Sequence, residues 1–108
     1  MAAPKQENGE SMPYTLTVAL DLADPALYAQ YRAAMRPLLE HEGGLFLYDF
    51  TISETLIAAD GQSYNRLFLL QFPSQAHHDR FFAHPDYLAL RHRFFTPAVR
   101  SFAILATA

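Results

Sequence analysis

Two stretches of this sequence are apolar on both sides of the strands that they predict, and this restricts the fold more than any other feature. Residues 44–55 and 64–72 are rich in the aromatic and aliphatic types that favour strands. An antiparallel sheet with one wet face would alternate apolar and polar side chains, so both faces of this sheet must be covered. The expected opposing sets are Phe46, Tyr48, Phe50 and Ile52 against Leu45 and Leu47 in the first stretch, and Phe68, Leu70 and Phe72 against Leu67 and Leu69 in the second.

The first half of the chain predicts a strand followed by a helix. Residues 14–22 alternate apolar and polar positions over nine residues. Asp24 supplies an N-cap acceptor and Pro25 suits the first helical turn, while Gly43 suits a left-handed helix end. Pro37 lies inside this helix and should kink it. An apolar stripe follows at spacings of four, four and three, formed by Leu27, Tyr31, Met35 and Leu38.

The second half predicts a hairpin, a bent helical layer and a last strand. Asp60-Gly61 marks the turn between the two apolar stretches. Ser74 is a candidate N-cap of a helix that is interrupted at His84-Pro85, and residues 99–106 form the last strand. The order β, α, β, β, α, β predicts an α+β, ferredoxin-like sandwich: an antiparallel four-stranded sheet with helices on one face.

The second face of that sheet needs a cover that the rest of the chain does not supply. Two helices cover one face, and a second copy of the sheet is the economical cover for the other, since two-fold pairing is the commonest arrangement of identical chains. We therefore expect a homodimer that pairs through its sheet, with larger oligomers left open.

Length and composition fit one folded domain. The chain has 108 residues, of which 51% are hydrophobic and 18% charged, outside the regime of disordered chains. We expect a flexible tail over residues 1–12 and a single ferredoxin-like domain over residues 13–108. Met12, directly before the first strand, is an alternative start of translation to Met1. The absence of Cys excludes disulfides and thiolate chemistry.

Charge and motifs exclude several function classes. A net charge of −3 with a single Lys argues against a nucleic-acid surface. Residues 1–12 contain no apolar run of the kind that a secretory signal needs, and no apolar stretch approaches the roughly 20 residues of a membrane span, so we expect a cytoplasmic protein without a membrane partner. No nucleotide loop, Ser-His-Asp set or zinc spacing is present, so neither cofactor nor metal is expected.

Several short motifs occur in an order that resembles a known family. The order and spacing resemble the bacterial domain-of-unknown-function family 1330, within the dimeric α/β-barrel superfamily, over almost the whole chain. The resemblance implies a ferredoxin-like fold and a dimer in which two sheets close a barrel. The superfamily includes cofactor-free monooxygenases, haem-degrading enzymes, isomerases and ligand-binding regulators, so the fold leaves the reaction open. The motifs are Asp24-Pro25, Tyr28 and Tyr31, Gly43-Gly44, Arg66, Phe72-Pro73-Ser74 and Asp86-Tyr87.

The chain departs from the family pattern at two positions. Asp49 stands where the family usually has Arg, and Gln71 stands where Glu is common. An ion pair typical of the family between these positions is therefore lost or rearranged.

Arg66 and Asp49 are the charged candidates for a ligand site. Arg66 is expected on the same side as Phe68, where it could clamp a carboxylate or phosphate. The alternative is an internal ion pair with Asp49 or Glu54. Asp49 lies among aromatic residues, where a carboxylate is costly unless it is paired or protonated. An unpaired Asp49 would be a candidate base.

Tyr48, Tyr64 and His78 complete the candidate ligand-binding residues. The two tyrosines could line the rim of a cleft, although most tyrosines here fit core positions. His78 is a candidate pocket residue because imidazole titrates near neutrality. Its neighbour His77 points about 100° away on a helix, so the pair cannot easily bind one ion.

Three functions remain open on the sequence. The first is a dimer that binds a small aromatic or anionic organic molecule between sheet and helices, and the second is a cofactor-free monooxygenase or isomerase that uses the same cleft. The third is a structural or interaction protein without a ligand. A closed interior with Arg66 paired to a carboxylate favours the third, whereas an open pocket of at least about 300 Å³ with Arg66 free favours the first two.

Overall fold

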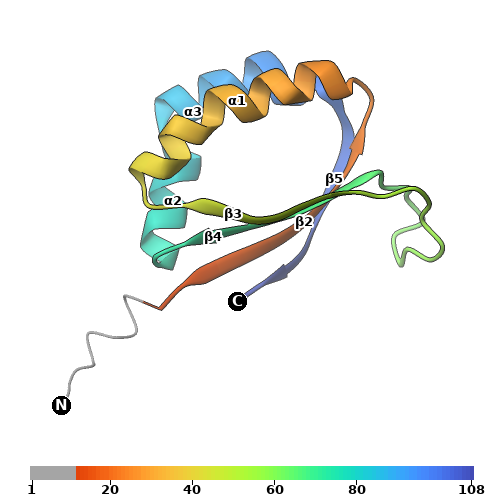
Figure 1. Cartoon of the computed structure of the whole chain (residues 1–108), viewed down its shortest axis with the longest axis horizontal. Helices are drawn as coiled ribbons and strands as arrows, with labels where there is room; N and C mark the ends of the chain where they lie inside the picture. The colour runs from red at the N-terminus through yellow and green to blue at the C-terminus, as the bar shows by residue number, and fades with distance from the viewer. Residues whose placement is uncertain (1–11) are drawn as a thin grey trace.

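A computed structural model describes residues 12–108 and contains one sheet with helices on one face (Figure 1). The sheet order is β3-β4-β2-β5, and every neighbouring pair is antiparallel. The predicted βαββαβ order and ferredoxin-like arrangement are therefore confirmed. The elements are β2 (Tyr14–Leu22), α1 (Pro25–His41), β3 (Leu45–Thr51), β4 (Arg66–Phe72), α2 (Gln75–Ala83), α3 (Pro85–Leu90), η2 (Arg91–Phe95), α4 (Thr96–Ala98) and β5 (Val99–Thr107).

The helix ends follow the local signals in the sequence. The Asp24 side chain accepts a hydrogen bond from the Leu27 N–H at the start of α1, and Gly43 follows the helix with a φ of 76°. Ser74 caps α2 and accepts from the His77 N–H. These caps satisfy amide groups that the first turn of a helix leaves unpaired. Residues 1–11, most of the predicted tail, lie outside the described residues, so the tail stays a prediction.

The core lies between the helical layer and the central strands. β2 and β4 direct alternate side chains toward the helices, and aromatic side chains from α1, α2, α3 and η2 pack onto them. Burial of these groups is the main source of stability for a domain of this size. The largest fully buried side chains are Tyr28, Phe72, Phe81, Leu20, Met35 and Leu39.

A bulge in β3 corrects the predicted orientation of its side chains. Phe46 pairs with Leu70, but the next pair joins Tyr48 to Leu69, so Leu47 is an extra residue in the ladder. The expectation that Tyr48 and Phe50 share the face of Phe46 was wrong. An extra residue reverses the alternation beyond it, so Tyr48 and Phe50 point away from the helices and Asp49 points toward them.

The helical layer contains a π-helical turn, between α3 and α4, that the sequence pattern did not predict. In η2 the Thr96 N–H bonds to the Arg91 carbonyl, five residues back. This wider turn changes the direction of successive side chains and is found frequently at functional sites. Here it separates Arg91, which lines a cavity, from Arg93, which is exposed.

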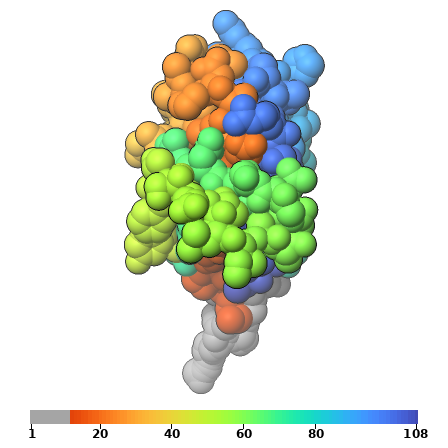
Figure 2. All heavy atoms as spheres, turned by 90° about the vertical axis from the view of Figure 1, so that its right-hand side faces the viewer, coloured from red at the N-terminus to blue at the C-terminus, as the bar shows by residue number. Residues whose placement is uncertain are grey.

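The sheet face opposite the helices is apolar along most of β3 and β4 and has no cover among residues 12–108. Segment 52–65, which joins β3 to β4, extends beyond one end of the sheet (Figure 1) and faces the viewer in Figure 2. The Thr55 hydroxyl holds its two arms together: it donates to the Tyr64 carbonyl at 2.9 Å and accepts from the Tyr64 N–H at 2.8 Å. The exposed apolar residues of this open face are Leu45, Tyr48 and Phe50, with Leu67 and Leu69 partly exposed beside them.

Candidate functional site

A cavity of about 270 Å³ lies between the sheet and the helices and is partly open to solvent. Every strand and most of the helical layer contribute to its wall, which is dominated by aliphatic and aromatic side chains. Ligand sites in proteins have this character: an apolar wall with a few polar groups that orient the ligand. The lining residues are Leu16, Val18, Tyr28, Tyr31, Met35, Phe46, Phe68, Leu70, His78, Phe82, Tyr87, Arg91, Phe95, Phe102 and Ile104.

Three tyrosines line this cavity. The hydroxyls of Tyr31 and Tyr87 hydrogen-bond each other at 2.8 Å across α1 and α3. The Tyr28 hydroxyl is buried and has no hydrogen-bond partner among residues 12–108. Burial raises the pKa of all three phenols, so they stay protonated and act as donors at neutral pH.

Arg91 is the charged group of the cavity wall. Its guanidinium carbon lies 5.3 Å from the ring centroid of Phe95 and 5.6 Å from that of Phe102, distances typical of cation–π contacts. No carboxylate of the part of the chain that the structure describes lies within 4.0 Å of it. Arg91 is therefore a half-buried cation without an acidic partner in residues 12–108.

The structure places His78 in the same wall, on α2. Its ring packs on Phe82 at 4.8 Å, on Tyr14 at 5.0 Å and on Phe72 at 5.5 Å between centroids. Its Nδ1 lies 2.8 Å from an Asp79 carboxylate oxygen. If Nδ1 carries the proton and donates it to Asp79, Nε2 is an acceptor.

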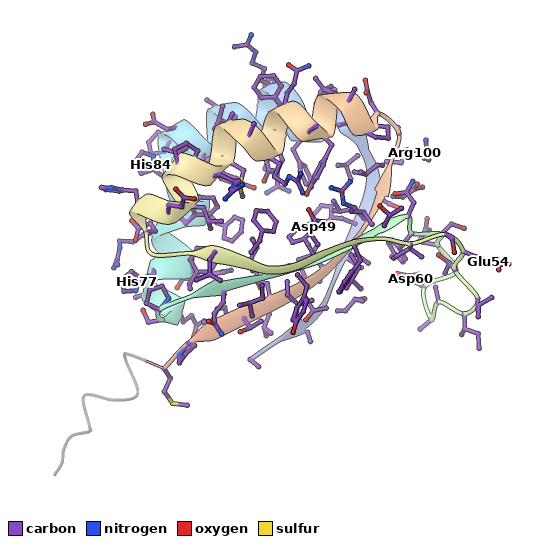
Figure 3. All side chains as sticks on the ribbon, in the orientation of Figure 1. Asp49, Glu54, Asp60, His77, His84 and Arg100 are labelled. Atoms are coloured by element: carbon purple, nitrogen blue, oxygen red, sulfur yellow. The ribbon has the colours of Figure 1, made fainter. Side chains whose placement is uncertain are left out.

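Arg66 and Asp49 pair with each other, one of the alternatives that the sequence left open. The Arg66 Nε donates to Asp49 Oδ1 at 2.8 Å and its Nη2 donates to Oδ2 at 3.2 Å. Arg32 on α1 donates to the same carboxylate from the other side. These hydrogen bonds with Asp49 raise the pKa of Arg66. Figure 3 shows Asp49 between the sheet and α1, outside the cavity lining.

Tyr48 and Tyr64 lie away from the cavity. Tyr48 stacks on Phe50 at 5.5 Å between centroids on the open face, because the bulge turns both outward. Tyr64 donates its hydroxyl to Asp60 in segment 52–65, where Figure 3 also places Glu54. Of the five candidates from the sequence, the cavity thus brings in His78 and leaves out Arg66, Tyr48, Tyr64 and Asp49.

Comparison with known proteins supports the resemblance noted in the sequence. The family described as "Domain of unknown function (DUF1330)" matches residues 14–107. The chain belongs to this family. No curated protein matches the DUF1330 chain as a relative.

Solved structures share the fold of this DUF1330 chain at low sequence identity. A protein of unknown function from Rhodopseudomonas palustris is 18% identical with a TM-score of 0.77, over 97% of this chain and 92% of the other. A DABB family protein with a ferredoxin-like fold from Mesorhizobium loti is 20% identical with a TM-score of 0.65, over 89% and 94%. A dimeric ferredoxin-like protein of unknown function from Bacteroides fragilis is 14% identical with a TM-score of 0.57, over 89% and 94%.

Sequence reasoning about the DUF1330 chain missed most of the polar groups in the cavity. Tyr28, Tyr31 and Tyr87 were assigned to core stripes, and they are indeed buried, but all three line the cavity, and the hydroxyls of Tyr31 and Tyr87 meet there. Their positions among the shared motifs were the available signal. Arg91 had no such signal, because its direction depends on the π-helical turn.

Metal binding and membrane crossing are the last two features to consider in residues 12–108 of the DUF1330 chain. Those residues contain no group of three or more His, Cys, Asp or Glu side chains that could hold a metal ion. No helix of that region is long and apolar enough to cross a bilayer.

We predict that Asp49→Asn destabilises the domain by about 1.5–3 kcal/mol, because the two arginines lose the negative charge and one acceptor oxygen of a mostly buried carboxylate, and the new NH₂ group faces their donors. Urea unfolding followed by circular dichroism measures the change. The matched control is Glu40→Gln, which breaks an exposed pair with Arg36 on the surface of α1 and should cost less than about 0.5 kcal/mol. Equal costs for the two variants would contradict this role of Asp49.

Proposed function

We propose that this DUF1330 domain is a homodimeric protein that binds a small aromatic organic molecule in the cavity between sheet and helices. The observation that carries the proposal is the cavity of about 270 Å³, whose wall combines apolar side chains with three tyrosines and an arginine without an acidic partner in residues 12–108. A protein that only needed a stable core would gain by filling this volume, since an unfilled cavity costs stability.

The pairing of Arg66 with Asp49 counts toward a purely structural protein, but the cavity itself counts against it. Its volume is slightly below the range of about 300–1,000 Å³ that is usual for drug-sized ligands, so it suits a small ligand of one or two rings. The aromatic residues Phe46, Phe68 and Phe95 in the wall favour a flat ring over a sugar or a peptide.

We expect 2-naphthamide, a neutral two-ring probe, to raise the melting temperature of the domain and to bind in isothermal titration calorimetry. Ile104→Trp should abolish this binding, because residue 104 lines the cavity and is 55% exposed, so a larger ring there narrows the opening without crowding the core. Leu88→Trp is the control, since Leu88 is similarly exposed but outside the lining. Unchanged affinity in Ile104→Trp would place the probe elsewhere.

The open sheet face supports the homodimer. Leu45, Tyr48 and Phe50 form an exposed apolar row beside β4, and contiguous exposed apolar patches mark interaction surfaces. Segment 52–65 adds Leu56 and Ile57, which are 81% and 93% exposed. A groove lies between this segment and the open face, and a second copy of this chain could fill it in a two-fold arrangement. The Bacteroides fragilis neighbour, described as dimeric, lends support.

We predict that the wild-type chain has the mass of a dimer at micromolar concentration and that Phe50→Glu weakens the dimer by at least tenfold, roughly the cost of truncating one central interface residue. Residue 50 is 51% exposed in a single chain, so the charge should not disturb folding. Size-exclusion chromatography with light scattering measures the mass. Leu88→Glu, on the helical side, should leave the dimer intact, and a monomeric wild type would refute the pairing.

A second candidate function is acid–base catalysis on the bound molecule, favoured by one observation. His78 lines the cavity while Asp79 lies against its Nδ1. A carboxylate in that position orients a histidine so that Nε2 can take a proton from a ligand. Proton abstraction needs no cofactor when the ligand carries an acidic C–H bond.

This candidate predicts that the domain accelerates exchange of the α-hydrogens of phenylacetone for deuterium in D₂O, followed by nuclear magnetic resonance. His78→Gln should reduce the rate at least about tenfold. This is a conservative expectation, because a general base typically contributes a factor of about 100 or more. His84→Gln is the matched control, because His84 also lies beside a carboxylate, that of Asp86, but outside the cavity lining. Equal rates for wild type and His78→Gln would remove His78 as a base.

A further inference from the structure

We infer that the ligand of this cavity is an aromatic acid whose carboxylate binds Arg91 and the Tyr31–Tyr87 hydroxyl pair while its ring occupies the apolar interior. The inference rests on the proposed binding function and adds the chemical class of the ligand. It also moves the anion contact from Arg66, the candidate from the sequence, to a residue of the π-helical turn.

Arg91 has the properties of an anion-binding side chain. It lines the cavity and is half-buried, and its guanidinium stacks near Phe95 and Phe102, which restricts its motion. Among residues 12–108, no carboxylate pairs with it. A guanidinium offers several N–H donors in a planar fork, which a carboxylate matches with its two oxygens.

The Tyr31–Tyr87 pair supplies a second donor beside this cation. One hydroxyl donates its hydrogen to the other, and the accepting hydroxyl keeps a hydrogen that no other residue of the described chain accepts. Phe95 connects the two groups: the Arg91 guanidinium carbon lies 5.3 Å from the centroid of its ring, and the ring of Tyr31 lies 5.1 Å from the same centroid. Burial keeps both phenols protonated by raising the pKa of each. A neutral phenol hydrogen and a guanidinium together suit a group that only accepts hydrogen bonds, such as a carboxylate.

The other cations near the inner face already have a carboxylate partner. Arg66 and Arg32 share the carboxylate of Asp49, and neither lines the cavity. An anionic group entering the cavity therefore meets the charge of Arg91. Apart from His78 and Tyr28, the remaining wall is aliphatic and aromatic, so most of the ligand beyond the carboxylate must be apolar.

The test compares 2-naphthoate with its neutral amide, 2-naphthamide, by isothermal titration calorimetry on the full chain. Wild type should bind the acid at least about tenfold more tightly than the amide, because hydrogen bonds between two charged groups are stronger than neutral ones. Arg91→Met keeps an unbranched side chain and loses the charge, so the acid should bind no better than the amide, while the affinity for the amide stays within about twofold.

Arg93→Met is the matched control. Residue 93 belongs to the same π-helical turn and packs on Phe94 at 5.0 Å, but it lies outside the cavity lining. The Arg93→Met variant loses the same charge as Arg91→Met, and its ratio of affinities for 2-naphthoate and 2-naphthamide should equal that of wild type. The double variant Tyr31→Phe/Tyr87→Phe should reduce acid binding, whereas either single variant keeps one hydroxyl that can donate to the ligand.

The outcomes separate the ligand class from the binding function. Equal affinities of wild type for acid and amide, or an Arg91→Met variant that still prefers the acid, would overturn the assignment of Arg91 and leave binding in the cavity intact. Failure of both probes to bind wild type would refute the binding function as well. The comparison of acid with amide in wild type needs no variant, so it holds even if a substitution prevents folding.

Discussion

The central strands β2 and β4 carry an inner row of large apolar side chains that the helical layer shields from water. Leu20 and Phe72 in this row are almost fully buried, and the aromatic rings of the helices pack against them. Burial of this row is the largest favourable term for a domain of this size. It also determines where the cavity lies, because the bent layer of α2, α3 and η2 covers the row without filling all the space above it.

The polar groups of the inner layer fall into two sets with different chemistry. In the first set, the Asp49 carboxylate accepts hydrogen bonds from Arg66 and Arg32, which leaves one net positive charge. This set joins α1 to the sheet. The second set, Arg91 with the Tyr31–Tyr87 pair, has donors without acceptors among residues 12–108. A structural ion pair and a binding site differ in this respect, since a site must leave groups for the ligand to satisfy.

The two faces of the sheet connect the proposed ligand site with the proposed dimer. Both involve β5, where Phe102 lines the cavity, Leu105 lines the groove on the open face and Ile104 lines both. Asp49 and Gln71, the two departures from the family pattern, lie on opposite faces, because Asp49 pairs with Phe68 and Gln71 pairs with Leu45. The two side chains therefore cannot contact each other, as the partners of an ion pair would. The Gln71 side chain instead donates a hydrogen bond to the Thr15 hydroxyl at 3.2 Å.

Local patterns in the sequence determined the element order, the caps at Asp24 and Ser74, the break at Pro85 and the presence of two apolar sheet faces, because each depends on residues close together in the chain. Three features were decided only by the tertiary structure. The bulge at Leu47 exchanges the faces of Tyr48 and Asp49, since register depends on a partner strand. The pairing of Asp49 with Arg66 and Arg32 joins three elements. The π-helical turn aims Arg91 at a cavity that exists only when strands and helices from both halves of the chain have packed together.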